Sequence, residues 1–432
     1  MISNFVTLEG KSRGYRMTVV ILAFLALSGF VSFIISYIQG HQMFGSSNTI
    51  PWGMPIVMTI YLIGLSAGLH ILAFFIYIMH QERYREVIRA AVFMAVVLIF
   101  GAMVFIALDL GRPEKFWRLF MLFYMNNMAS MFAINAIFYS SYLLSAVIYL
   151  VSLLNNMKRF SMIMGMIAFG WAMLTHGGTG AIFGFISARE TWLSPLSPFE
   201  FIFAALTSSL ALLIIVLVII YKVTGRELSR ELISSLGGLV KGLLLGMLLL
   251  MVIGELTHIY SPDRDAVMYM LTGPFSWLFW VFLIGMGVIV PLVILFHPRA
   301  KKSVLGIVIA SVLIVIGVFV KRYYLVIPGA AYPLHYYPGK IEGVWGALGS
   351  FTFAPAEIIL SVGIVAFLGL LFILGLKYLE LLPAVEKPKE TPKLAEEATD
   401  GSKETLEPGD EAAAESKETS EPAVDSIAES ES

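Results

Sequence analysis

The stretch that decides the fold is residues 48–79, which read NTIPWGMPIVMTIYLIGLSAGLHILAFFIYIM. This apolar run is long enough to cross a bilayer, since a helical span takes roughly 20 residues. Pro51 and Trp52 stand near its start, where a first helical turn tolerates proline and amphipathic aromatics anchor a helix at the interface. Gly64 and Gly68 begin and end a patch of small residues, GLSAG, which predicts close approach of a neighbouring helix. His70 follows inside the span, where an ionisable side chain is costly and is therefore a functional candidate.

The composition of the whole chain indicates a polytopic α-helical membrane protein. Of its 432 residues, 58% are hydrophobic and 14% are charged, and the mean hydropathy is +0.84. These values exclude a soluble globular domain. The net charge of −1 gives no indication of nucleic-acid binding. The chain has no cysteine, which excludes disulfides, thiolate zinc sites, c-type haem attachment and cysteine-ligated iron–sulfur clusters within it.

We predict an all-α transmembrane bundle of about ten spans, using a hydrocarbon thickness of roughly 30 Å as the ruler. The predicted spans are 17–37, 51–79, 87–107, 130–154, 160–183, 201–221, 239–257, 275–296, 304–320 and 355–376. Lysine and arginine are concentrated in the loops on the side of the N-terminus, which predicts that both termini are cytoplasmic. Lys321 and Arg322 are interpreted as charges that follow the end of the ninth span. We divide the chain into a cytoplasmic N-terminus (1–16), a transmembrane domain (17–380) and an acidic tail (381–432) whose composition predicts disorder.

Ionisable residues collect at the extracytoplasmic end of the predicted spans. They are Asp109 with Arg112 just beyond it, His176, Glu255 and His258, together with Glu200 and Glu357, for which helix capping is an equally good interpretation. Glu255 and His258 are three residues apart and share a helix face. Histidine titrates near neutral pH, and a carboxylate beside it can orient it or accept a proton. We therefore predict that His176, Glu255 and His258 exchange protons with a two-proton redox ligand such as a quinol.

Other interpretations of these residues stay open. His176 and His258 also fit as the two axial ligands of a b-type haem. A secondary transporter is likewise a bundle of about ten helices, although it usually carries internal repeats, and we find none here. A structural anchor for an external enzyme would need no acid–base cluster. The run Gly177–Gly180 fits either a close approach of backbone to a ligand or a close helix crossing.

The inner halves of the predicted spans are almost purely apolar. Ser66, His70 and Lys241 are the obvious stepping stones for a proton there. Proton movement from the cytoplasmic side therefore has weak support in the sequence.

Several motifs resemble the NrfD/PsrC family of membrane quinol-oxidoreductase subunits. They are NTIPWG (48–53), GLSAG (64–68), ALDLGRPEKFW (107–117) and LTHGGTGAIFG (174–184). Three later segments are similar to the longer branch of that family, the ten-span HybB/DsrP-like proteins: RYYLVIPG (322–329), YYPGKIEGVW (336–345) and FAPAEIILS (353–361). The resemblance covers residues 17–376 and leaves out the acidic tail.

The resemblance implies a subunit in the plasma membrane of a prokaryote that binds quinone or quinol, of menaquinone or ubiquinone type, near the extracytoplasmic face. It implies a ferredoxin-like iron–sulfur subunit docked on that face. Beyond that subunit it implies a catalytic subunit, which is a molybdopterin enzyme, a nickel–iron hydrogenase or a multihaem cytochrome. The protein would then act within a complex, not as an enzyme alone, and would carry no haem or metal of its own.

The resemblance also implies where the quinone site lies. The residues carried over are His176, Glu255 and His258, with Asp109 and Arg112 as the supporting outer-edge pair and Trp52 and Tyr260 as ring or headgroup contacts.

Overall fold

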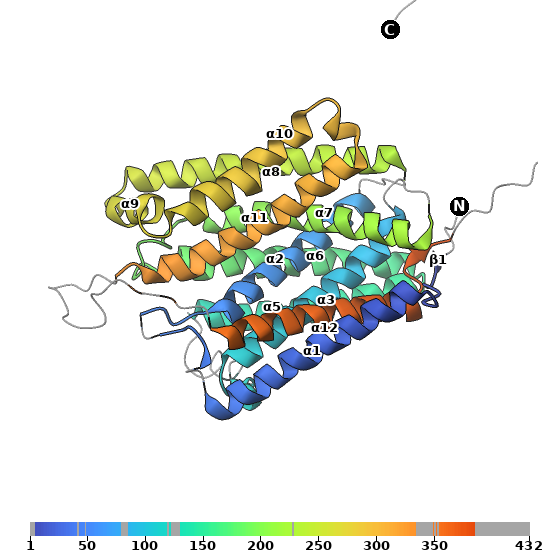
Figure 1. Ribbon diagram of the computed structural model, residues 1–432, viewed down its shortest axis with the longest axis horizontal. Helices are drawn as coiled ribbons and strands as arrows, with labels where there is room; N and C mark the ends of the chain where they lie inside the picture. The colour runs from blue at the N-terminus through green and yellow to red at the C-terminus, as the bar shows by residue number, and fades with distance from the viewer. Residues whose placement is uncertain are drawn as a thin grey trace, which may run out of the picture. The chain divides into compact units, whose positions relative to one another are not determined.

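A computed structural model describes residues 5–40, 43–47, 49–78, 85–118, 121, 130–226, 229–333, 349, 351 and 354–384. Within these residues, ten helices are long and apolar enough to cross a membrane (Figure 1). This confirms the predicted all-α bundle of about ten spans. The acidic tail beyond residue 384 and the motif at 336–345 lie outside the described residues.

The ten spans are α1 (Arg13–Gln39), α2 (Met54–Ile78), α3 (Arg85–Asp109), α5 (Met131–Leu154), α6 (Lys158–Gly184), α7 (Ser197–Thr224), α8 (Arg230–Ile259), the π-helix η4 (Leu278–Ile289) continued by α10 (Val290–Phe296), α11 (Val304–Ala331) and α12 (Pro355–Tyr378). The shorter elements are β1 (Phe5–Val6), η3 (Pro113–Lys115), α9 (Arg264–Thr272), η5 (Ala300–Lys302) and β2 (Leu382–Pro383). Four spans begin at a serine whose side chain accepts a backbone N–H of the first turn, namely Ser12, Ser130, Ser229 and Ser303.

Helix α2, which lies within the apolar run at 48–79, is the central helix of the bundle. Its residues 55–73 are all buried, and it packs against α3, α6, α7 and α11. The predicted small-residue patch makes this packing possible. A Cβ atom on Gly68 would lie 2.5 Å from the carbonyl oxygen of Ala205 in α7, and one on Gly64 would lie 2.9 Å from the ring of His176 in α6. Only glycine leaves room for helices this close.

Helices α1 and α12 form a pair, seen side by side in blue and orange-red in Figure 1. They cross at Gly29 and Gly363, where a Cβ on Gly29 would lie 2.6 Å from the Gly363 Cα. At one end of this pair, β1 and β2 pair antiparallel, with Phe5 opposite Pro383. The two ends of the described chain therefore meet at one end of the bundle, which we call the far end. That this end is cytoplasmic, and the boundaries of the three predicted segments, stay predictions.

The predicted end of the ninth span is wrong. Helix α11 does not stop at residue 320 but continues to Ala331, through Pro328, so Lys321 and Arg322 lie inside it. Arg322 is 1% exposed, although it was interpreted as a charge in a loop. The helix can continue because α6 and α7 supply polar and aromatic partners for these side chains.

Candidate functional site

Three consecutive residues of α11 extend from this helix toward different neighbours, at the end of the bundle opposite to the far end. Lys321 contacts α7, Arg322 lies between α6 and α7, and Tyr323 approaches α12. Successive residues of a helix point about 100° apart. The segment therefore connects three groups of polar side chains, and we call the end where they lie the site end.

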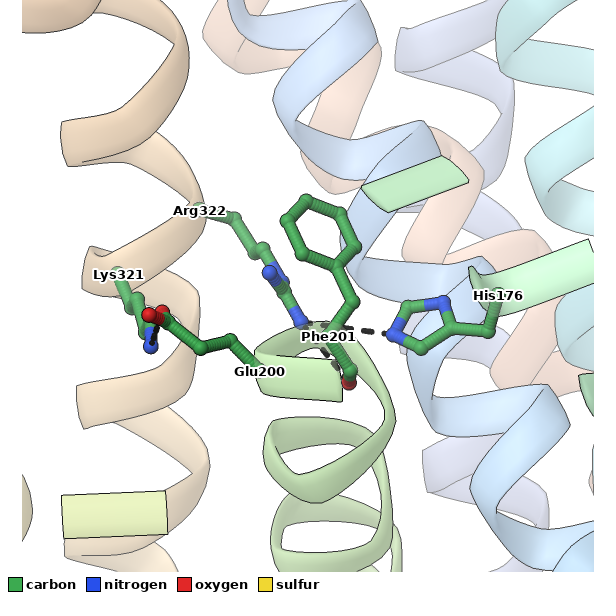
Figure 2. Close-up of polar contacts among 5 residues, drawn as sticks. All are labelled: His176, Glu200, Phe201, Lys321 and Arg322. Carbon is green, nitrogen blue, oxygen red and sulfur yellow. Dashed lines mark hydrogen bonds and ion pairs between the residues drawn. The ribbon is translucent and has the colours of Figure 1, made fainter. Parts of the chain in front are cut away.

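Arg322 and His176 form the buried centre of the site (Figure 2). The Arg322 Nη2 atom lies 3.4 Å from His176 Nε2 and 3.4 Å from the carbonyl oxygen of Phe201. The guanidinium also lies over the Phe201 ring, 3.8 Å from its centroid, which is cation–π geometry. His176 is fully buried, and its ring packs against Phe201 with 5.4 Å between centroids.

The contact between the two side chains decides where the proton of His176 lies. A guanidinium can only donate hydrogen bonds, so the contact with Arg322 assigns Nε2 of His176 as the acceptor and the ring proton to Nδ1. Both His176 Nδ1 and Arg322 Nη1 are buried and have no hydrogen-bond partner in the part of the chain that the structure describes. The site thus presents two buried donors without acceptors, which is rare in folded proteins and points to a missing acceptor.

A second group lies on the other side of the first turn of α7, at the left of Figure 2. Lys321 Nζ donates to Glu200 Oε2 at 2.9 Å, and both side chains are mostly buried. Helix α8 approaches closely here, because a Cβ on Gly254 would lie 2.6 Å from Glu200 Oε1. The half-buried Glu255 interacts electrostatically with both Glu200 and Lys321. Two carboxyl groups therefore lie near one lysine.

A third group surrounds Glu357, the first-turn acid of α12. Its side chain is 1% exposed and accepts the backbone N–H of Met54 at 3.3 Å. Tyr323 and the half-buried Asp109 both interact electrostatically with it. Asp109 is therefore near a second carboxylate. No ion pair joins it to Arg112 among the described residues, and Arg112 is exposed.

Aromatic rings connect this centre to the site-end surface. Trp52 stacks on Trp192, with 5.4 Å between centroids and 9° between planes, and Phe183 meets both rings edge-on. Phe183 in turn stacks on Phe201 at 6.1 Å. The predicted contact residue Trp52 thus belongs to an aromatic cluster whose last member, Phe201, touches both His176 and Arg322.

The loop between α6 and α7 holds the end of α11 in place. The last turn of a helix leaves carbonyl groups without partners. Thr191 Oγ1 donates to the carbonyl of Gly329 at 2.7 Å, and Arg189 Nη1 donates to that of Ala330 at 2.9 Å. One turn earlier, Trp192 Nε1 donates to the carbonyl of Leu325 at 2.7 Å. These bonds fix the helical turns that follow Arg322.

The structure brings together some of the predicted site residues and not others. His176 lies at the centre, Glu255 in the second group, Asp109 in the third, and Trp52 in the aromatic cluster. The side chain of His258 is half-buried, and its carbonyl accepts the hydroxyl of Ser261 at 2.9 Å where α8 ends. Tyr260 is 89% exposed. The glycines Gly178 and Gly180 serve close packing, since a Cβ on Gly180 would lie 2.7 Å from the backbone of Pro198.

Sequence reasoning missed the role of Arg322, which is the central cation of the site. The signal was present, since RYYLVIPG was among the motifs that carried the resemblance. It also missed Trp192, which lies in a loop without hydrophobic periodicity.

The protein is a ten-span α-helical membrane bundle with a buried histidine–arginine pair at one end. Comparisons with known proteins identify its family. The family model described as "Polysulphide reductase, NrfD" matches residues 42–333. The "Hdr-like menaquinol oxidoreductase integral membrane subunit" of Archaeoglobus fulgidus is 34% identical over 399 residues, covering 90% of this chain and all of that protein.

Two further relatives are more distant. A selenate reductase subunit of Mesobacillus selenatarsenatis is 27% identical, covering 86% of this chain and 94% of that protein. A polysulfide reductase subunit of Wolinella succinogenes is 26% identical, covering 68% of this chain and 99% of that protein. The protein belongs to the NrfD family of polytopic membrane proteins, which confirms the resemblance.

Proposed function

We propose that this protein is the integral membrane subunit of a quinone-linked respiratory oxidoreductase complex. It exchanges electrons and protons between the membrane quinone pool and a partner subunit at the site end. The single observation that carries this proposal is the pair of buried donors without acceptors among the described residues, His176 Nδ1 and Arg322 Nη1. The name of the Archaeoglobus relative, a menaquinol oxidoreductase subunit, supports the same ligand class and favours menaquinone.

The residues at the centre fit a quinone headgroup. Its carbonyl oxygens are hydrogen-bond acceptors, and both unpartnered atoms are donors. A bound quinone supplies two-electron, two-proton redox chemistry. Arg322 holds a fixed positive charge where negative charge develops on such an oxygen, which favours its reduction. His176 donates from Nδ1 and can pass its proton to that oxygen, or take one back in the opposite direction.

The second group can hold protons close to the ligand. Glu200 forms an ion pair with Lys321 and Glu255 interacts electrostatically with both, so the two carboxyl groups have different surroundings and can take up a proton in turn. His258 lies one helical turn beyond Glu255 and is half-buried, which extends the group toward the site-end surface. Asp109 and Glu357 form a second pair of neighbouring acids. Arg112 and Tyr260 lie at the exposed surface, where a partner docks.

A small apolar pocket of about 10 Å³ lies between α3, α5 and α6. It is lined by Met103, Ile106, Phe116, Phe132, Ala136, Tyr139 and Ile182. The hydroxyl of Tyr139 lies 2.9 Å from Thr179 Oγ1, and Thr179 is one turn beyond His176 on α6. The pocket therefore lies within about one helical turn of the site along α6.

The partner at the site end is an iron–sulfur subunit of the ferredoxin type, with a catalytic subunit beyond it. This protein has no cysteine and cannot hold such a cluster itself. The names of the relatives, subunits of selenate and polysulfide reductases, support a complex with a separate catalytic subunit. The site end is then extracytoplasmic, as the distribution of lysine and arginine predicts.

The alternative of a b-type haem with His176 as an axial ligand has less support. The nitrogen of His176 that normally faces an iron, Nε2, faces the guanidinium of Arg322 instead. A cation at this position opposes a metal there.

The experiment that tests the proposal is a substitution at His176 in the complete complex. We expect His176→Leu to assemble with the partner subunits, as judged by co-purification, and to lose quinol-linked electron transfer by at least roughly tenfold, since a catalytic proton-transfer group is removed. His297→Leu removes an exposed histidine outside the site and is the matched control. Full quinol-linked turnover in assembled His176→Leu complex would mean that the protein is an anchor and that the proposed site is wrong.

A further inference from the structure

A second buried histidine, His70, lies on the central helix α2, outside the site described above. It is 2% exposed, and its Nδ1 lies 2.7 Å from the hydroxyl of Tyr142 in α5. That hydroxyl lies 2.9 Å from Ser66 Oγ, which lies 2.6 Å from the carbonyl oxygen of Ala95 in α3. Ser66 and Tyr142 are fully buried. Four groups from three helices thus form one hydrogen-bonded series.

One arrangement of protons satisfies every contact in this series. The carbonyl of Ala95 can only accept, so the hydroxyl of Ser66 must donate to it. Ser66 then has no proton left for Tyr142, so Tyr142 must donate to Ser66. Tyr142 in turn has no proton left for the ring, so His70 must donate from Nδ1. This count of donors and acceptors places the ring proton of His70 on Nδ1.

This tautomer leaves His70 Nε2 as an unprotonated acceptor. That atom is buried and has no hydrogen-bond partner among the described residues. Leaving a buried acceptor unpaired costs roughly 1–3 kcal/mol. The ring cannot turn to relieve this cost, because the hydrogen bond to Tyr142 holds it. An unprotonated imidazole nitrogen is a base, so this fixed lone pair can accept a proton.

The position of His70 relates this atom to the quinone site. The ring of His176 packs against Gly64 of α2, six residues before His70. At 1.5 Å per residue, His70 is about 9 Å farther from the site end along the same helix. Buried polar side chains continue along one face of α5 from one end to the other: Asn135, Tyr139, Tyr142 and Tyr149. The ring of Tyr149 lies 6.0 Å from that of His70 on the side of the far end.

We propose that His70 Nε2 is an intramembrane proton-binding site through which this subunit exchanges the protons of quinone chemistry with the compartment at the far end. The proposal rests on the proposed function. Reduction of one quinone consumes two electrons, which arrive from the partner subunit at the site end, and two protons, which come from the far end through His70. Oxidation of a quinol reverses both movements. Electrons and protons then enter from opposite faces, so turnover moves charge across the membrane.

The test is a measurement of charge movement in the complete complex, reconstituted into sealed liposomes with menaquinone. A potential-sensitive dye reports the membrane potential during turnover, and quinol-linked turnover of the same preparations is measured in detergent, where no potential forms. We expect the wild-type complex to move about one charge per electron. We expect His70→Gln to lose at least four-fifths of this charge movement and to keep most of its turnover in detergent. Wild-type turnover without charge movement, or His70→Gln with wild-type charge movement, would overturn the proposal.

Two further variants keep the test decisive if His70→Gln fails to assemble. Tyr142→Phe leaves His70 in place but frees its ring, so we expect it to halve the charge moved per electron or to lower it further. Thr207→Val removes a buried hydroxyl of α7 that donates to the carbonyl of Phe203 in the same helix, outside the series around His70, and should leave this ratio unchanged. Equal charge ratios in the two variants would contradict the proposal. Absence of quinol-linked turnover in the wild type would instead refute the proposed function.

Discussion

The substitution Arg322→Met tests whether Arg322 serves the function of the protein or its stability. Arg322 is 1% exposed, its two hydrogen-bond contacts are both 3.4 Å long, and its Nη1 has no partner among the described residues. A buried charge with such incomplete pairing contributes little to stability, and an apolar side chain of similar length is often neutral or stabilising in its place. We therefore expect the free energy of unfolding of the variant to lie within about 1 kcal/mol of the wild-type value, or to exceed it.

The expected loss of activity follows from the contacts that Arg322 offers to a ligand. One hydrogen bond from a charged donor contributes roughly 1.5–3 kcal/mol. At about 1.4 kcal/mol per factor of ten, this predicts a fall in quinol-linked turnover of roughly ten- to a hundredfold. The assay is turnover of the purified complex with a soluble quinol analogue, normalised to the amount of assembled complex, alongside thermal unfolding in detergent.

Arg89→Met is the matched control at the far end. Arg89 is also deeply buried, but it donates to the carbonyl of Leu153 at 2.8 Å, to Asn156 Oδ1 at 2.7 Å and to the carbonyl of Glu380 at 3.1 Å. Its removal leaves these acceptors unpaired, so we expect a loss of roughly 3 kcal/mol or more in stability. Turnover per assembled complex should not change. If Arg322→Met destabilises the complex as much as Arg89→Met and keeps full turnover, Arg322 is structural and the reasoning fails.

Three further predictions concern packing and pairing. Gly68→Ala should lower the free energy of thermal unfolding by about 1–3 kcal/mol, because the new Cβ meets Ala205 and Ser209. Gly238→Ala is the control, since a Cβ there lies in open space and should not destabilise the protein. Equal effects of the two substitutions would contradict the packing argument. Thr191→Val should cost about 1 kcal/mol and speed hydrogen exchange in the last turn of α11, and unchanged exchange there would show that Thr191 does not cap it. In a double-mutant cycle, Glu200→Gln and Lys321→Met should show a coupling of about 1–3 kcal/mol, and additive effects would mean that the pair is weak.

The number and places of the spans could be predicted from the sequence because they depend on a local property. A run of apolar residues of membrane length forms a helix whatever its neighbours are. The GLSAG patch likewise predicted close helix packing, because missing side-chain volume is visible in the sequence itself.

The centre of the site could be predicted only in part, because it depends on distant contacts. Arg322 is buried by His176 and Phe201, which lie 146 and 121 positions away in the sequence. Without those partners, a Lys-Arg pair is expected to end a span, and that rule placed the end of α11 wrongly. His176 could be found because an isolated histidine in an apolar span is conspicuous. The division of the acids into two groups could not, since it depends on how α7, α8 and α12 are placed around α11.

The pairing of α1 with α12 has a consequence for biosynthesis. The hydroxyl of Ser32 donates to the carbonyl of Ala356, across 324 positions of sequence. Helix α1 therefore leaves the ribosome long before α12, which is its main partner among the described helices. Until then its apolar surface must be covered by lipid or by the insertion machinery, while α2 to α11 assemble without it. Closure of α12 onto α1, sealed by the β1–β2 pairing, is expected to follow the assembly of α2 to α11. A polypeptide truncated before α12 should present α1 as an unpaired helix to membrane quality control.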